Sequence, residues 1–310
     1  QTLITTDKKF LTPKICVLLA SFNGERFIAE QLESIRIQKH VDIDLYISDD
    51  NSSDRTIEII KEYQSLFKNS FSIKIFKNNL NSGSSTLNFL NLLTKIDLKN
   101  YHAISFSDQD DIWLEDKLIS AWKKIEDGQN HGYSSSFINF KIGKKNKFIK
   151  KHYRQKKYDF IFEAPGPGCT FLINQELSLK LKNLINKNKD RAKEISYHDW
   201  FIYFYCRSLN FSWYIDNKSY ILYRQHDRNV LGSNVGFKPF LKRLKLIVSG
   251  EYRNQIKNNL SLSPRKYYFS EYIINKSLVG NLELAKSFTE FRRNPKEALL
   301  LFFTFTFFLF

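Results

Sequence analysis

Short apolar runs alternate with amphipathic stretches over the first 125 residues of the chain. Each run has the length of a β-strand, and in the stretch that follows it apolar side chains recur at helical spacing. The expected strands cover residues 14–21, 42–50, 72–78 and 102–109, and the expected helices cover residues 25–38, 51–67, 85–96 and 114–125. Alternating strands and helices are typical of a parallel α/β sheet with right-handed crossovers. We therefore expect a mostly parallel sheet flanked by helices.

The pattern becomes irregular after residue 128. A basic loop at 144–157 holds eight Lys or Arg, and GPGCTFLIN (166–174) predicts a turn followed by a strand. Further on, the pattern predicts helices at 175–187 and 197–209 and a strand, turn and strand at 212–226. From about residue 237 the chain is basic, aromatic and helical in pattern. We therefore divide it into a domain at 1–236 and a helical C-terminal region at 237–310.

Polar clusters follow three of the expected strands. They are ASFNG (20–24), SDDNSSD (48–54) and SDQDD (107–111). In open α/β sheets, ligands bind outside the carboxyl ends of the strands. The three clusters should therefore converge on one crevice.

The SDQDD cluster places three carboxylates within four positions. In an extended strand end Asp108 and Asp110 point to the same side, and Asp111 can turn back in the next loop. Carboxylate oxygens are the ligands that Mg²⁺ and Mn²⁺ prefer. An Asp-rich turn in which Asp111 or Glu115 caps the next helix explains the same residues. The residues alone do not separate a metal site from a capped turn.

The other two clusters suit a nucleotide. Asp49 and Asp50 can accept the N–H of a pyrimidine base or a ribose hydroxyl, although an ordinary turn and helix cap also fits them. Ser21 and Asn23 would expose polar groups at the end of the first strand. Neither a GxGxxG nor a GxxxxGK[ST] loop is present, so the sequence does not predict a dinucleotide site or that type of phosphate loop.

Two later motifs add candidate groups. In YHDW (197–200), Asp199 is a candidate general base if it faces the acidic cluster, and a helix cap if it does not. In YRQH (223–226), His226 can ligate a metal and Arg224 can clamp phosphate. Polar residues at an exposed strand end explain YRQH equally well.

Composition points to an anionic partner. The chain has 48 Lys and Arg against 32 Asp and Glu, a formal net charge of +16. Nucleic acid, an acidic membrane leaflet, a phosphorylated substrate or merely a solvated basic surface fits this excess. The three cysteines are odd in number and none stands in CxxC spacing, which argues against a disulfide framework or a zinc knuckle and indicates a reducing compartment.

The C-terminal stretch ALLLFFTFTFFLF (298–310) is almost wholly apolar. It is shorter than the roughly 20 residues that span a bilayer as a helix. Because Arg292, Arg293 and Lys296 precede it, an interfacial anchor on an anionic leaflet is one interpretation. A core helix or strand, or part of a longer spanning helix, is the other.

Taken together, the motifs resemble glycosyltransferase family 2. KICVLLASFNGERFIAEQLESI, DLYISDDNSSDRT and ISFSDQDDIWLEDKL resemble the opening half of these enzymes. With GPGCTFLIN, YHDW and YRQH, the order is similar to that of bacterial rhamnosyltransferase-type members that build surface polysaccharides. The resemblance covers about residues 13–235 and implies a GT-A fold, in which a nucleotide-binding sheet is joined to an acceptor-binding half.

The resemblance also implies roles for the candidate residues. Contacts to the nucleotide sugar would come from Ser21, Asn23, Asp49, Asp50 and Asp108, with Arg224 on the phosphates. Metal ligands would be Asp110, Asp111 and His226, and the general base would be Asp199. Where the family has an acidic pair before the base, this chain has His198 and Asp199.

The implied activity is inverting transfer of a sugar, with rhamnose favoured, to a saccharide or polyprenyl-linked acceptor. The donor would be UDP- or dTDP-linked, and Mn²⁺ or Mg²⁺ would assist. The QxxRW motif of processive synthases is absent, which favours addition of one sugar per event. The enzyme is expected at the cytoplasmic face of an anionic membrane, with no nucleic-acid partner.

Two rival functions remain on the sequence alone. A sugar-phosphate nucleotidyltransferase needs a Gly-rich basic loop after the first strand, and ASFNGERF supplies one Gly and one Arg. A non-enzymatic basic module that binds nucleic acid or membrane does not explain three acidic clusters at strand ends.

Overall fold

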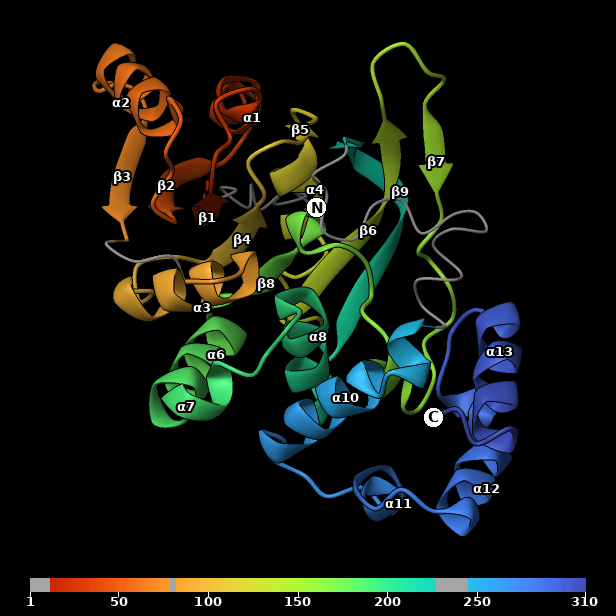
Figure 1. Ribbon diagram of the computed structural model, residues 1–310. Helices are drawn as coiled ribbons and strands as arrows, with labels where there is room; N and C mark the ends of the chain where they lie inside the picture. The colour runs from red at the N-terminus through yellow and green to blue at the C-terminus, as the bar shows by residue number, and fades with distance from the viewer. Residues whose placement is uncertain (1–11, 79–81, 227–244) are drawn as a thin grey trace, which may run out of the picture.

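A nine-stranded sheet forms the centre of the protein (Figure 1). The computed structural model describes residues 12–78, 82–226 and 245–310. The strands are β1 (Lys14–Ser21), β2 (Asp42–Asp49), β3 (Ser72–Lys77), β4 (Ala103–Ser107), β5 (Ile112–Trp113), β6 (Gly132–Phe140), β7 (Lys147–Ile149), β8 (Leu172–Asn174) and β9 (Trp213–Arg224). Their order across the sheet is β3-β2-β1-β4-β8-β6-β9-β5, and β7 pairs with β6.

The first four strands of this order are parallel, as the sequence predicts. The second half is mixed: β8 runs antiparallel to β4 and β6, whereas β6 and β9 are parallel. The helices that follow the parallel strands are α1 (Ile28–Arg36), α2 (Thr56–Leu66), α3 (Ser85–Lys95) and α4 (Lys117–Trp122). The later helices are α5 (Asp159–Phe162), α6 (Gln175–Lys187), α7 (Lys189–Ala192) and α8 (His198–Ser208).

Both faces of the sheet are buried. Along β1, Ile15, Val17 and Leu19 enter one apolar cluster with residues of α1, whereas Cys16 and Leu18 enter a second with residues of α3, α6 and α8. Successive side chains of a strand point to opposite faces, so a strand covered on both sides is a continuous apolar run. This explains why KICVLLAS contains no alternation of polar and apolar residues.

Two predicted elements differ from the structure. The helix expected at 114–125 is limited to α4, because Ile112 and Trp113 before it pair with Leu222 and Ile221 of β9. The strand, turn and strand expected at 212–226 is the single strand β9. Its pairing with β6 shifts register near Ser135, so the polar residues in its middle form an irregularity and not a turn.

The C-terminal helices share the core of the rest of the chain. They are α10 (Glu251–Ser261), α11 (Ser270–Ile274), α12 (Leu278–Lys286) and α13 (Pro295–Thr306). Ile256, Phe269, Phe291 and Phe305 belong to the same apolar cluster as α3 and α8. The boundary predicted at 236/237 lies outside the described residues. Among the described helices, none has the length and apolarity that crossing a bilayer requires.

Buried and partly buried ion pairs also hold this region against the rest of the chain. Arg293 Nε lies 3.3 Å from Asp159 Oδ2 and 3.1 Å from Glu163 Oε1. Arg292 pairs with Glu163 at 3.8 Å and with Glu297 at 3.1 Å. The sequence left both an interfacial anchor and a core element open for this stretch, and the structure pairs Arg292 and Arg293 with carboxylates of the protein.

Candidate active site

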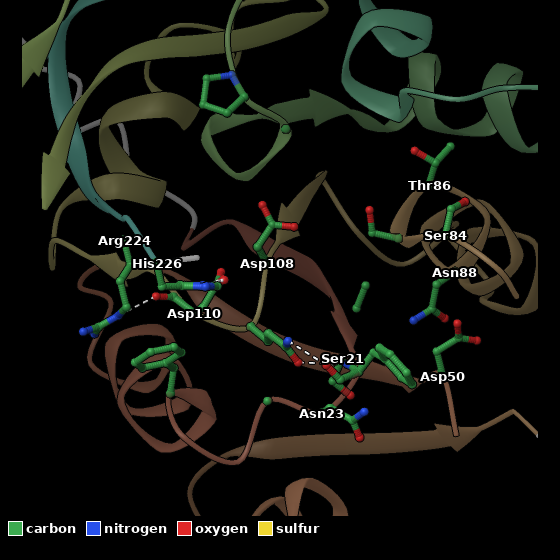
Figure 2. A pocket seen from close by; sticks show the side chains of 18 of the residues that line it. Ser21, Asn23, Asp50, Ser84, Thr86, Asn88, Asp108, Asp110, Arg224 and His226 are labelled. Atoms are coloured by element: carbon green, nitrogen blue, oxygen red, sulfur yellow. Dashed lines mark hydrogen bonds and ion pairs between the residues drawn. The ribbon is translucent and has the colours of Figure 1, made fainter. Parts of the chain in front are cut away.

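One cavity of about 1160 Å³ lies at the carboxyl ends of the parallel strands. The polar clusters that follow β1, β2 and β4 all contribute to its wall, as the sequence predicts. Figure 2 shows Asp50 and Asn88 at one side of the cavity and Asp110 and His226 at the other, with Asp108 between them. Further lining residues come from the start of α3, the start of α8 and the end of β9.

Asp49 lies behind this wall. It is fully buried, and its carboxylate accepts hydrogen bonds from the Ser21 hydroxyl at 2.9 Å and from the Ser52 N–H at 2.9 Å. Asn23 lines the cavity, and its Oδ1 accepts the Ser53 N–H at 2.9 Å. These bonds join the turns after β1 and β2. Asp49 therefore shapes the site without facing it, whereas Ser21 and Asn23 do face it.

Asp50 lines the cavity just after the end of β2, and Asp54 of the same cluster lines it as well. The Asp50 carboxylate accepts the Ser82 N–H at 2.6 Å, the Ser82 hydroxyl at 3.0 Å and the Asn78 amide at 3.2 Å. Charge-assisted bonds of this kind hold a carboxylate in one orientation. Asp50 is therefore preorganised to accept a donor group from a ligand.

Asp110 and His226 face each other across the end of β9. The distance from His226 Nε2 to Asp110 Oδ2 is 2.6 Å, and the His226 ring stacks on Phe27 at 5.1 Å. Asp108 lines the same wall. Burial, together with the nearby charges of Asp110 and Asp199, raises the pKa of Asp108 to about 7. Carboxylates gathered in this way favour a bound cation.

Asp111 points away from the cavity. It is buried, its Oδ1 accepts the Arg224 N–H at 3.1 Å, and its ligand atom groups with those of Asp108 and Cys169 within 4.8 Å. Burial, with the neighbouring Asp110 and Asp108, raises the pKa of Asp111 well above its usual range. Asp110 and His226 line the cavity, and Asp111 is not among the described residues that line it. The alternative capping role is not formed either, because no side chain caps α4.

Arg224 lines the cavity but is held by protein groups. Its Nε donates to the carbonyl of Asp110 at 2.8 Å, and its guanidinium pairs with Glu30 and lies 4.7 Å from the Phe27 ring. These contacts fix the turn that carries Asp110. The Arg224 side chain is therefore better placed to support the acidic cluster than to clamp a phosphate.

Asp199 enters the cavity from the first turn of α8. Its Oδ1 accepts the Trp200 N–H at 2.7 Å, and burial raises the pKa of Asp199 to about 6. Burial lowers the pKa of His198 to about 4, so this ring is neutral at pH 7. A Cβ on Gly168 would lie only 2.3 Å from His198 Nε2. Of the two neighbours, Asp199 has the charge that a general base needs.

Sequence reasoning missed Gln109, which lies between the predicted nucleotide-sugar contact Asp108 and the predicted metal ligand Asp110. Its side-chain amide bonds to both backbone groups of Phe22, so it joins the ends of β4 and β1. It also missed Lys141 and Ile142, which line the cavity from the β6–β7 hairpin. The position of Gln109 within SDQDD was a signal that could have identified it. The sequence pattern around residue 141 gave no signal for Lys141 or Ile142.

Solved structures share this fold. S. aureus TarS in complex with UDP-GlcNAc superposes with a TM-score of 0.59 at 16% identity, covering 94% of this chain and 81% of that one. A mannosyltransferase from Pyrobaculum calidifontis in complex with GDP-Man and Mn²⁺ gives a TM-score of 0.53 at 13% identity, covering 97% and 85%. The protein therefore has the GT-A fold of glycosyltransferases.

Sequence comparison identifies the family. The family described as "Glycosyl transferase family 2" matches residues 16–217. The dTDP-rhamnosyl transferase RfbG of Shigella flexneri is 39% identical over 281 residues, which are 91% of this chain and 96% of that protein. An E. coli UDP-Glc:alpha-D-GlcNAc-diphosphoundecaprenol beta-1,3-glucosyltransferase, WfgD, is 24% identical over 161 residues, or 51% of this chain and 59% of that protein. This chain belongs to glycosyl transferase family 2, and it is a rhamnosyltransferase-like enzyme.

Proposed function

We propose that the enzyme transfers rhamnose from dTDP-rhamnose to a hydroxyl of a saccharide acceptor, with inversion at the anomeric carbon. The similarity to a dTDP-rhamnosyl transferase over nearly the whole chain supports this donor. Matches to two glucosyltransferases whose names contain diphosphoundecaprenol or PP-undecaprenol support a lipid-linked acceptor. Such an acceptor would place the enzyme at the cytoplasmic face of an anionic membrane, where surface polysaccharide such as capsule begins.

The observation that carries the proposal is the meeting of Asp50, Asp108, Asp110 and Asp199 in one cavity. Asp50 is oriented to receive the N–H of a pyrimidine, and Ser21 and Asn23 lie beside the same strand ends. Asp108 lies between this nucleotide end and Asp110 (Figure 2). It would therefore contact the donor ribose or sugar.

The residues present also suit a divalent cation. Asp110 offers a carboxylate oxygen and His226 an imidazole nitrogen on the same wall, with Asp108 nearby. Oxygen ligands suit Mg²⁺ and Mn²⁺, and the nitrogen favours Mn²⁺. When bound, the cation would neutralise the charge that develops on the departing nucleoside diphosphate.

Asp199 would act as the general base. The acceptor oxygen attacks the anomeric carbon of the donor as its proton passes to the Asp199 carboxylate. The bond from that carbon to the phosphate oxygen breaks, and its electron pair leaves with the diphosphate. A raised pKa near 6 keeps Asp199 ionised at neutral pH and makes it a stronger base than an ordinary carboxylate.

A donor screen tests the proposal. The purified enzyme would be incubated with dTDP-rhamnose, UDP-Glc, UDP-GlcNAc and GDP-Man, with Mn²⁺, Mg²⁺ or EDTA, and nucleotide release would be measured with and without a polyprenyl-linked acceptor. We expect turnover with dTDP-rhamnose that needs the metal and is lost in Asp110→Ala. Preference for another donor would refute the rhamnose assignment, and full activity in EDTA would refute the metal assignment.

A further inference from the structure

Helices α12 and α13 leave large apolar side chains in solvent. On α12 the exposed fractions are 62% for Leu278, 68% for Val279 and 48% for Leu282. Leu299 and Phe303 on α13 and Phe307 at its C-cap are spaced four residues apart and are likewise exposed. We call these six residues the α12–α13 apolar face. Other residues of the same helices, including Leu284 and Leu301, fill the core, so both helices are apolar on two sides.

The β6–β7 hairpin presents apolar side chains among positive charges. Ile142 is 74% exposed and Phe148 is 50% exposed. Residues 141–157 contain nine Lys or Arg and no Asp or Glu. The net positive charge per residue is therefore higher in this segment than in the whole chain. Over all 310 residues, 32 Asp and Glu offset 48 Lys and Arg.

The hairpin is connected to both the C-terminal helices and the cavity. The segment after β7 contacts the residues before α13, through the Tyr158 N–H to the Glu290 carbonyl at 3.0 Å and through Asn294 to the Tyr153 hydroxyl at 3.5 Å. Figure 1 shows β7, α13 and α12 along the same edge of the view. At its tip, Lys141 lines the cavity.

We propose that the α12–α13 apolar face and the β6–β7 hairpin form one surface that lies on an anionic lipid bilayer. Large exposed apolar patches on soluble proteins mark interaction sites. Interfacial binding combines burial of apolar side chains in the headgroup region with attraction of Lys and Arg to anionic lipids. Both components occur here on connected elements.

Charge favours lipid over a second copy of the chain. Residues 245–310 hold ten Lys or Arg against five Glu, and the hairpin adds only positive charge. Two such surfaces would repel each other, whereas an anionic leaflet attracts both. This inference rests on the proposed function in one respect: the hairpin at the cavity would then receive a lipid-linked acceptor as it leaves the bilayer.

The test is co-sedimentation of the full chain with vesicles of phosphatidylcholine, alone or with phosphatidylglycerol. One variant combines Leu282→Ser, Phe303→Ser and Phe307→Ser. A second combines Lys144→Gln, Lys145→Gln and Lys147→Gln, and its matched control combines Lys61→Gln, Lys123→Gln and Lys187→Gln on other exposed surfaces. None of these residues lines the cavity.

We expect wild type to bind the anionic vesicles and both surface variants to bind them at least about tenfold more weakly. The lysine control should bind within about twofold of wild type. Metal-dependent release of nucleotide in the absence of acceptor should be unchanged in all variants, which shows that they are folded.

Equal vesicle binding by wild type and both surface variants would overturn the proposal, as would no binding by wild type. A dimer in sedimentation that the serine variant disperses, without vesicle binding, would assign the apolar face to a second copy instead. Vesicle binding without turnover of any nucleotide sugar would refute the proposed function alone.

Discussion

The side-chain amide of Gln109 forms two hydrogen bonds with Phe22, accepting its N–H and donating to its C=O, each at 2.9 Å. The pair connects the turn after β4 to the turn after β1, and both residues line the cavity. Gln109→Ala should therefore loosen the nucleotide pocket and weaken nucleotide binding about tenfold, since each bond contributes roughly 1 kcal/mol. Titration calorimetry with dTDP would measure this. Gln129→Ala, at an exposed turn, is the control, and equal affinity in both variants would contradict the role.

Gly24 and Gln109 should be energetically coupled. A Cβ added at Gly24 would lie 2.2 Å from Gln109 Oε1. Gly24→Ala should therefore displace Gln109 and weaken dTDP binding about as much as Gln109→Ala does. In the double variant the clash is gone, so the second substitution should cost little. A double-mutant cycle measures the coupling, and additive losses would show that the two sites are independent.

Asp110 and Asp111 should respond differently to the same substitution. Asp110→Asn should shift the Mn²⁺ concentration needed for half-maximal turnover upward by about tenfold or more, because a charged ligand is lost. Asp111→Asn should leave that concentration within about twofold, since the Asn oxygen can still accept the Arg224 N–H. Metal titrations of both variants would decide. A larger shift in Asp111→Asn would move the metal toward the buried group with Cys169.

Turnover should fall as the pH drops through about 6. Asp199 must be ionised to accept a proton, and burial raises its pKa to about 6. The ionised carboxylate is therefore lost below that pH and predominates above it. Asp199→Asn should lower kcat by about 10²–10⁴ while dTDP affinity stays near wild type. A pH–rate profile that is flat between 5 and 8, or full transfer by the variant, would remove Asp199 from the role.

Arg293 should matter for stability more than its place near the C-terminus suggests. Arg293→Met leaves Asp159 and Glu163 in a buried environment without this partner. Breaking a buried pair from one side costs about 3–5 kcal/mol. Asp159 keeps the Tyr203 hydroxyl at 2.9 Å and Arg207 at 3.5 Å, which favours the lower figure. Urea unfolding measures the loss, and the exposed Lys296→Ala should change stability by less than about 0.5 kcal/mol.

The sequence predicted the parallel half of the sheet because its strands are covered on both faces and are unbroken apolar runs. It predicted the convergence of the three polar clusters because parallel strands end at the same edge. It did not distinguish Asp49 from Asp50 or Asp110 from Asp111. Two neighbouring Asp residues differ only in the direction in which their side chains point. That direction depends on partners such as Ser52, which lies in a turn, and Arg224, which is distant in sequence.

The second half of the chain was harder to predict, because its structure also depends on partners that are distant in sequence. β9 is one strand because β6 follows it across an irregularity near Asp216, and nothing local to residues 212–226 indicates that partner. Arg292 and Arg293 follow a polar segment and precede an apolar one, which in isolation is typical of a membrane anchor. Only the folded chain places Asp159 and Glu163 against them.

The C-terminal helices share one apolar core with α3 and α8 and are joined to α5 by buried ion pairs, so they cannot swing away without opening that core. If the α12–α13 apolar face lies on a bilayer, as proposed, the cavity would stay at a constant height above that bilayer. Only acceptor chains whose terminal hydroxyl reaches that height would then be extended by the enzyme. Glycan length, and not only the identity of the last sugar, would decide which molecules receive the next residue.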